Sequence, residues 1–238
     1  MHSIYDPDTL ARSSGSDFSL SLNRIYNFVY GWMATGLLIS GVVAYFLAQM
    51  FIEQPPPFGI LKLCCIVEIL LVIGLSALIH KMPLPLAALL FIVYAALNGA
   101  TLSVIFLIFD LAAIQSVFFI TAGTFAGMAL FGSLTQKNLS GLGRICIMGL
   151  WGIILASIVN FFLGADGLQS IISYVGVAVF VGLTAWDAQK VRLLAEQQDQ
   201  MDSLTVRRLG LLCALELYLD FINLFLYLLR IFGRKDHS

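Results

Sequence analysis

The chain has 238 residues, a net charge of −1, and a composition that is 60% hydrophobic and only 11% charged. Soluble globular proteins average about 25% charged residues, so this composition excludes an ordinary soluble domain. The balanced charge offers no attraction for a polyanion, and we therefore expect no nucleic-acid partner. The four cysteines all lie in apolar segments, which is typical of free thiols rather than of a disulfide framework or a zinc site. We accordingly expect no resident cofactor.

The first 24 residues are polar, with several aspartates and a serine-rich run. They lack the apolar stretch of a cleaved signal peptide. The sequence therefore predicts a flexible N-terminal tail over 1–24 and an uncleaved first membrane span.

Seven apolar segments follow this tail, separated by charges, prolines and turn residues. A helix needs about 20 mostly apolar residues to cross the hydrocarbon core of a bilayer. We therefore predict an all-α membrane protein, a bundle of seven transmembrane helices within 25–233. The predicted spans are about 25–50, 58–79, 84–109, 113–134, 145–163, 168–187 and 211–232. The only substantial polar loop is then 190–208, and 234–238 form a short C-terminal tail.

The basic residues indicate the orientation of the bundle. Seven spans place the N-terminal tail and the loops after the second, fourth and sixth spans on one side of the membrane. That side carries nine Lys and Arg: Arg12, Arg24, Lys81, Lys137, Arg144, Lys190, Arg192, Arg207 and Arg208. The positive-inside rule then predicts a cytoplasmic N-terminus and an external C-terminus. A basic C-terminal tail leaves one alternative open, a re-entrant last helix that returns to the cytoplasm.

Ionisable residues inside the spans are candidate functional groups, because a membrane charge is costly unless it is paired or hydrated. Lys62 lies near a helix end and can reach the interface. Glu68 lies mid-helix, where it either lines a cavity or bonds a polar neighbour such as Asn98 or Asn160. Glu216, near the inner end of the last span, either reaches water or serves the same site as deeper acids.

Asp187 and Asp220 are expected to be partners. They lie on consecutive antiparallel spans, and helical side chains tilt toward their own N-terminus, so the two carboxyl groups lean toward one another. Two carboxylates in a poorly hydrated site cannot both ionise easily and titrate as a unit. Protonated, they share a hydrogen bond; deprotonated, they repel unless a cation enters, and oxygen ligands suit Ca²⁺. The pair is therefore either a proton-sensitive gate that ligates Ca²⁺ or a contact that only fixes helix packing.

Small residues in the fourth span predict close helix packing. Gly123-x-x-x-Gly127 has the spacing that lets two helix backbones approach, and Gly132 follows it. We expect this spacing to serve packing within the bundle.

Two segments around these aspartates resemble a known family. LYLDFINLFLYLLRIFG at 217–233 and FVGLTAWDAQKV at 180–191 are similar to the signature segments of the Bax inhibitor-1 family, also called the transmembrane Bax inhibitor motif or lifeguard family. Further segments at 29–38, 97–106 and 156–163 resemble its bacterial inner-membrane branch.

This resemblance implies a multi-pass protein of the cell inner membrane with the last helix at the centre of the bundle. It also implies a pH-sensitive Ca²⁺ leak in which Asp187 and Asp220 form the proton sensor. One departure concerns an arginine that some members carry at the inner end of the second helix. That position is Ile79 here, so the adjacent His80 either substitutes or faces the headgroups. Glu216 would add a further oxygen ligand.

The leading hypothesis is a passive cation leak whose partners are the lipid bilayer, Ca²⁺ and protons. The alternative is a membrane-embedded regulatory protein that modulates a membrane protease or stress response by contacting another membrane protein. An enzyme is disfavoured: intramembrane aspartyl proteases resemble a Gly-x-Gly-Asp arrangement, whereas LTAW precedes Asp187 and LYL precedes Asp220.

Overall fold

The computed structural model describes residues 7–53, 56, 58–79 and 81–233. Within these residues the secondary structure is helical, with no strand. The helices are α1 (Pro7–Glu53), α2 (Phe58–Leu78), α3 (Leu84–Leu102), α4 (Ile105–Ile108), α5 (Leu111–Leu134), α6 (Ser140–Leu163), α7 (Asp166–Gln197) and α8 (Ser203–Phe232), with a 3₁₀ turn at Gln198–Gln200.

Seven of the described helical segments are long and apolar enough to cross a membrane, which confirms the predicted seven-helix membrane fold. α3 and α4 together form one span, Leu84–Ile108. The helix is interrupted at Ser103, whose hydroxyl donates a hydrogen bond to the carbonyl oxygen of Ala100 at 2.6 Å. Such back-bonding competes with the regular backbone pattern and bends membrane helices.

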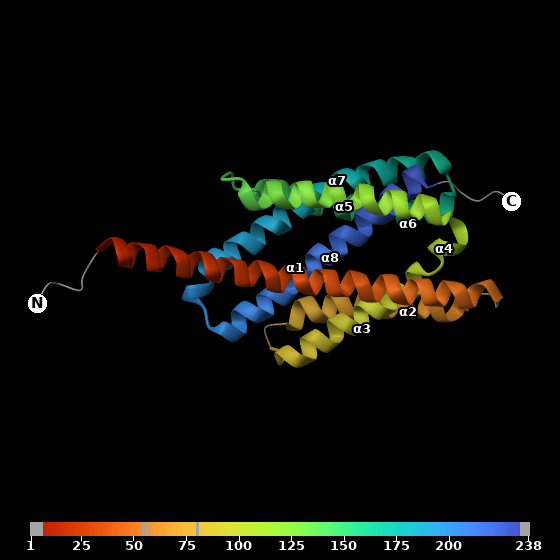
Figure 1. The fold of residues 1–238 in the computed structure, drawn as a ribbon. Helices are drawn as coiled ribbons and strands as arrows, with labels where there is room; N and C mark the ends of the chain where they lie inside the picture. The colour runs from red at the N-terminus through yellow and green to blue at the C-terminus, as the bar shows by residue number, and fades with distance from the viewer. Residues whose placement is uncertain (1–6, 54–55, 57, 80, 234–238) are drawn as a thin grey trace, which may run out of the picture.

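The last helix lies at the centre of the bundle, as predicted. Figure 1 shows α1, α2 and α3 on one side and α5, α6 and α7 on the other, with α8 crossing between them. α8 packs on α7, α1, α5 and α3. In its most apolar stretch 67% of the residues are buried, against 11% in α2 and in α6. α8 is therefore the helix around which the other spans are arranged.

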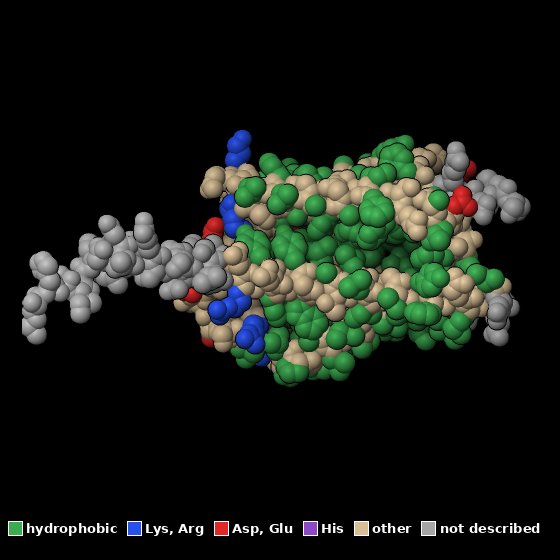
Figure 2. Space-filling view, in the orientation of Figure 1, with side chains coloured by type: hydrophobic (Ala, Val, Ile, Leu, Met, Phe, Trp, Pro, Cys, Tyr) green, Lys and Arg blue, Asp and Glu red, His purple; other side chains and the backbone are tan. Residues whose placement is uncertain are grey.

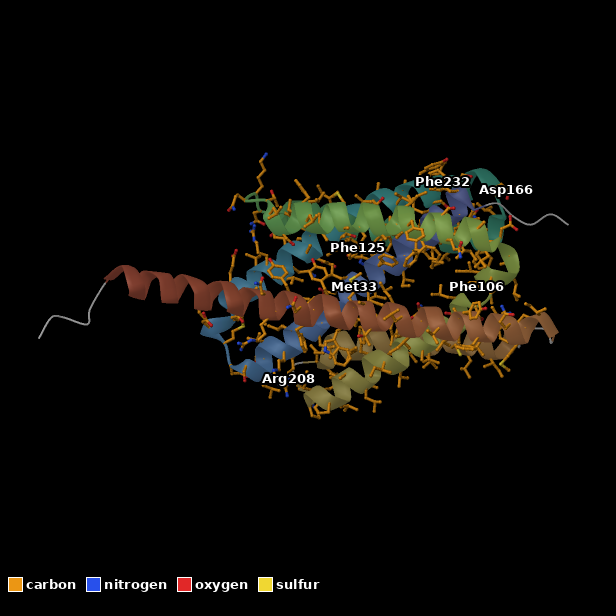
Figure 3. The ribbon with its side chains drawn as sticks, in the orientation of Figure 1. Met33, Phe106, Phe125, Asp166, Arg208 and Phe232 are labelled. Atoms are coloured by element: carbon orange, nitrogen blue, oxygen red, sulfur yellow. The ribbon has the colours of Figure 1, made fainter. Side chains whose placement is uncertain are left out.

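The outer faces of the spans carry exposed hydrophobic side chains, as expected where the solvent is lipid. Figure 2 shows these side chains over the long middle of the visible face, with Lys and Arg gathered at one end. Figure 3 places Arg208 toward that end and Asp166 and Phe232 at the opposite end, while the buried Met33 and Phe125 lie between the two groups of helices. The first of these ends is called the basic end below.

The N-terminal segment differs from the predicted flexible tail. α1 begins at Pro7, so residues 7–24 are helical. Proline is tolerated at the first helical position because it has no backbone N–H to contribute there. No later proline interrupts the segment, and extending an existing helix is much easier than nucleating one. Residues 1–6 and 234–238 lie outside the described part of the chain.

The predicted polar loop at 190–208 is wrong for most of its length. α7 continues to Gln197 and α8 begins at Ser203, so only a short turn separates them. Val191, Leu194 and Ala195 recur at helical spacing and are buried in the core cluster with Ile25 of α1 and Val206 of α8. Burial of this apolar face extends the helix beyond the point where the composition becomes polar.

Polar side chains on the same extension of α7 hold the connection between α5 and α6. Gln189 Oε1 accepts a hydrogen bond from the backbone N–H of Leu139 at 2.8 Å, and its Nε2 donates to Lys137 O at 2.8 Å. Arg192 Nη1 donates to Thr135 O at 2.6 Å and so caps the end of α5. These contacts satisfy backbone groups that a helix end leaves unpaired.

Close packing of α5 depends on Gly132 rather than on the Gly123–Gly127 spacing. A Cβ at Gly132 would lie 2.0 Å from the carbonyl oxygen of Ala185 on α7. A Cβ at Gly123 or Gly127 would meet nothing within 4 Å. The expectation that the Gly-x-x-x-Gly spacing packs within the bundle is therefore wrong, because those two glycines lie on a face of α5 that no described neighbour covers.

Candidate functional site

Four charged side chains from α7 and α8 form a cluster where these two helices pack against each other. Asp187 and Lys190 are three residues apart on α7, and Glu216 and Asp220 are four residues apart on α8. Both spacings put the two side chains on one helix face. Because α7 and α8 are antiparallel neighbours, the two faces meet. We call these four residues the charged cluster.

Lys190 is the cation of the charged cluster. Its Nζ lies 2.8 Å from Asp187 Oδ1 and donates a hydrogen bond of 2.6 Å to Glu216 Oε2. The ammonium also lies 4.4 Å from the centre of the Trp186 ring, a distance at which cation–π attraction operates. The Lys190 side chain is 29% exposed and that of Glu216 is 31% exposed, so both reach the rim of the cluster.

Asp187 and Asp220 lie deeper. Their carboxyl groups are within hydrogen-bonding reach of each other, and the residues are only 5% and 4% exposed. Asp220 Oδ2 receives no hydrogen bond from any donor in the described part of the chain. An ionised carboxylate can only accept, so a hydrogen bond between the two groups requires a proton on one of them. The two carboxyl groups therefore lie together on the wall of one cavity, away from bulk water.

The charged cluster forms part of the wall of a cavity of about 950 Å³. The opposite wall is made by α2, with Ile69 and Val72, and by a long strip of α6 that includes Leu150 and Phe161. All four charged residues line this cavity, and the remaining lining is mostly apolar. The cavity therefore connects the aspartate pair with the space between α2 and α6.

Glu68 is not part of the charged cluster. Its Oε2 accepts a hydrogen bond from Asn98 Nδ2 at 3.1 Å, and its Oε1 accepts one from Thr101 Oγ1 at 3.0 Å. This settles the open alternative for Glu68 in favour of Asn98. Asn160 instead donates to Gln169 Oε1 at 3.0 Å.

Tyr218 extends the Glu68 network across the bundle. Its hydroxyl donates to Asn98 Oδ1 at 2.9 Å and lies 2.7 Å from Ser40 Oγ on α1. Tyr218 is two residues from both Glu216 and Asp220, so it leaves α8 on the opposite face. α8 therefore separates two polar sites, the charged cluster on one side and the Glu68 network on the other.

The sequence-based reasoning missed Lys190 as a member of the site, although its spacing of three residues from Asp187 was visible. Ile79 is buried, and His80 lies outside the described residues. Lys62 is exposed, as expected for an interfacial lysine. The four cysteines are free thiols, as predicted.

Whether the charged cluster can bind a divalent cation depends on the position of the Lys190 ammonium. No group of three or more His, Cys, Asp or Glu side chains in the described residues is arranged to hold a metal ion. The ammonium of Lys190 lies between Asp187 and Glu216, where a cation would otherwise lie. Carboxylate oxygens are suitable ligands for Ca²⁺, but Ca²⁺ can bind to them here only when the Lys190 ammonium moves away.

Comparison with known proteins agrees with this architecture. A family described as "Inhibitor of apoptosis-promoting Bax1" matches residues 22–237. The inner membrane protein YbhL of Escherichia coli K12 is 46% identical over 214 aligned residues, which cover 87% of this chain and 90% of YbhL. An uncharacterized protein of Borreliella burgdorferi is 41% identical over 219 aligned residues, covering 91% and 94% of the two chains.

A more distant relative, the uncharacterized protein RP147 of Rickettsia prowazekii, is 35% identical over 239 aligned positions and covers 97% of this chain and 98% of RP147. The family match and the aligned lengths therefore cover nearly the whole membrane domain. With seven apolar helices around a buried last helix, the chain is a multi-pass membrane protein that belongs to the Bax inhibitor-1 family.

Proposed function

We propose that the protein is a pH-sensitive passive cation leak, with Ca²⁺ as the transported ion, gated by Asp187 and Asp220. The observation that carries the proposal is the meeting of these two buried carboxyl groups on the wall of a cavity. A cation path through a membrane needs negatively charged groups that line a cavity, and ionisable residues at such places mark ion and proton pathways.

The gate works through one shared proton. With a proton between Asp187 and Asp220, the hydrogen bond ties α7 to α8, and the four side chains of the charged cluster carry a net charge of −1. Without it, three carboxylates oppose one ammonium and the net charge is −2. The two aspartates then repel, and a cation is attracted to the place between them. The leak is therefore expected to be larger at higher pH.

Lys190 determines how readily a permeating cation can bind at the gate. Its ammonium binds both Asp187 and Glu216 while the gate is closed. A permeating Ca²⁺ must compete with this built-in cation for the same oxygens. In the proposed mechanism, Lys190 takes the part of the arginine that some family members carry on the second helix.

We place the protein in the inner membrane with a cytoplasmic N-terminus. YbhL is an inner membrane protein by name. The Lys and Arg gathered at the basic end indicate which end of the bundle faces the cytoplasm (Figure 2). The charged cluster would then lie toward the cytoplasmic side.

The test is Ca²⁺ flux into liposomes that contain the purified protein and an enclosed Ca²⁺ indicator, measured at pH 6 and pH 8. The wild type is expected to leak more at pH 8. In Asp220→Asn the amide donates permanently to Asp187, so the leak should stay low at both pH values. Asp166→Asn removes an exposed acid at the opposite end and serves as the matched control. Wild-type liposomes no leakier than empty ones would refute the proposal.

A further inference from the structure

The cavity beside the charged cluster has a shape and lining that an ion path does not require. Along α8 it extends from Glu216 to Tyr227, eleven residues, or about 16 Å at 1.5 Å per residue. That length is about half of the 30 Å hydrocarbon thickness of a bilayer. Its charged residues are at one end of the cavity, the end directed toward the basic end of the bundle. The rest is a groove of apolar and aromatic side chains that runs toward the other membrane face.

The apolar part of the groove is formed mainly by α6 and by the facing residues of α2 and α7, including Ile153, Phe161, Val72 and Phe180. α2 and α6 are the two least buried spans, and the cavity lies between them. The groove therefore faces the hydrocarbon of the bilayer rather than water. A hydrocarbon chain of one leaflet matches this wall in length and polarity.

The charged end of the groove has hydrogen-bond acceptors without matching donors. Asp220 Oδ2 is buried and receives no hydrogen bond in the described part of the chain. Asn223 uses its amide nitrogen to donate to Leu219 O at 2.8 Å, which leaves its Oδ1 as an acceptor. Glu216 binds Lys190 through Oε2, leaving Oε1. These three residues share one face of α8, and all line the cavity.

We propose that this cavity binds an ammonium-bearing lipid, with its head at Glu216, Asp220 and Asn223 and one hydrocarbon chain along α6. A primary ammonium has three N–H donors and no acceptor, which complements the acceptor oxygens that Lys190 leaves free on Glu216, Asp220 and Asn223. The charged cluster has a net negative charge in either protonation state, so it favours a cation over a neutral or anionic head. A volume of about 950 Å³ is of the size that binds small amphipathic ligands.

Trp186 provides a native reporter, because its ring lines the cavity and contacts Lys190. The other tryptophans are Trp32 and Trp151. Trp151 lies on α6 outside the cavity lining and is 63% exposed, so it reports the bulk lipid. Two single-tryptophan proteins, W32F/W151F and W32F/W186F, therefore separate binding in the cavity from partition into the bilayer.

The experiment measures fluorescence quenching in phosphatidylcholine nanodiscs by three hexadecyl probes with the same nitroxide on the chain, bearing an ammonium, an alcohol or a sulfate head. We expect the ammonium probe to quench Trp186 with an apparent dissociation constant about fivefold lower than that of the alcohol, which is the effect of one accessible ion pair. The same ratio measured at Trp151 should be close to one.

Variants locate the head of the probe. Glu216→Gln and Asn223→Ala are expected to reduce the preference for ammonium at Trp186, and Asp220→Asn tests the deepest acceptor. Glu68→Gln removes a buried acid on the opposite side of α8 and should leave the preference unchanged. Equal preference at Trp186 and Trp151, preference for the sulfate, or full preference retained in both Glu216→Gln and Asn223→Ala would overturn the inference. None of these readouts requires a leak, so the result stands apart from the proposed transport.

Discussion

Lys190 Nζ of α7 lies 2.6 Å from Glu216 Oε2 of α8. The same ammonium lies 2.8 Å from Asp187 Oδ1, so one cation holds an acid from each of the two helices that form the aspartate pair. This relationship makes the contact between α7 and α8 partly electrostatic at the charged cluster, whereas apolar side chains such as Leu183 and Leu224 are buried elsewhere along the two helices. The charged cluster therefore contains its own cation, the Lys190 ammonium.

Lys190→Met is expected to lower stability and to raise the leak. Removal of the ammonium leaves Asp187 and Glu216 without their cation, and an unsatisfied charged partner at a part-buried site costs about 1–3 kcal/mol. Thermal unfolding in detergent and Ca²⁺ flux in liposomes measure the two effects. Lys62→Met, which changes an exposed lysine, is the matched control. A leak equal to that of wild type in Lys190→Met would show that the ammonium does not compete with the permeating ion.

Tyr218→Phe is expected to destabilise the protein by about 1–3 kcal/mol, because it leaves the buried Asn98 Oδ1 without its donor. Tyr94→Phe is the control. Tyr94 packs edge-on against Tyr218 and takes no part in the hydrogen bond between Tyr218 and Asn98. The midpoint of thermal unfolding should fall clearly in the first variant and little in the second. Equal shifts in the two variants would contradict the network through Tyr218.

Gly132→Ala is expected to force α5 away from α7. The new methyl group would lie 2.0 Å from Ala185 O, a backbone atom that cannot move aside alone. Overpacking of this kind costs about 1–3 kcal/mol. Gly127→Ala adds the same methyl group to the same helix where nothing lies within 4 Å, and it should be neutral or slightly stabilising. Comparable expression and thermal stability of the two variants would be inconsistent with the observed approach of the helices.

The stability of the first turn of α8 is expected to depend on pH through Asp202. Its Oδ2 accepts a hydrogen bond from the backbone N–H of Thr205 at 2.8 Å, and hydrogen bonding to Thr205 lowers the pKa of the Asp202 carboxyl. A lowered pKa in the folded state means that the stabilisation is complete above the unfolded value of about 3.9 and is lost as pH falls through the folded pKa.

Hydrogen exchange of the first amides of α8 measures this contribution. Asp202→Ala should speed their exchange at pH 7, after correction for the intrinsic rate, and the difference from wild type should shrink as pH falls below the unfolded pKa of Asp202. Asp199→Ala, one turn earlier and outside the helix cap, is the control. Unequal protection that persists at low pH would mean that another group caps the helix.

The membrane fold could be predicted from the sequence because each span depends only on the residues within it. Each span needs only a run of about 20 apolar residues, and such runs are visible without knowledge of the neighbours. The error at 190–208 has the opposite cause. Val191, Leu194 and Ala195 extend α7 because they are buried against α1 and α8, and composition averaged over a polar window hides such a narrow face.

The sequence by itself determined the seven spans and predicted Asp187 and Asp220 as partners, since they lie on consecutive antiparallel spans and their side chains tilt toward one another. Only the tertiary structure decided what surrounds them. The choice of Lys190 as the cation, the separation of Glu68 behind Tyr218, and the use of Gly132 rather than Gly127 all depend on which faces of which helices touch. In lipid the apolar faces are nearly interchangeable, so those pairings are fixed by close packing and by a few buried hydrogen bonds between residues far apart in the chain.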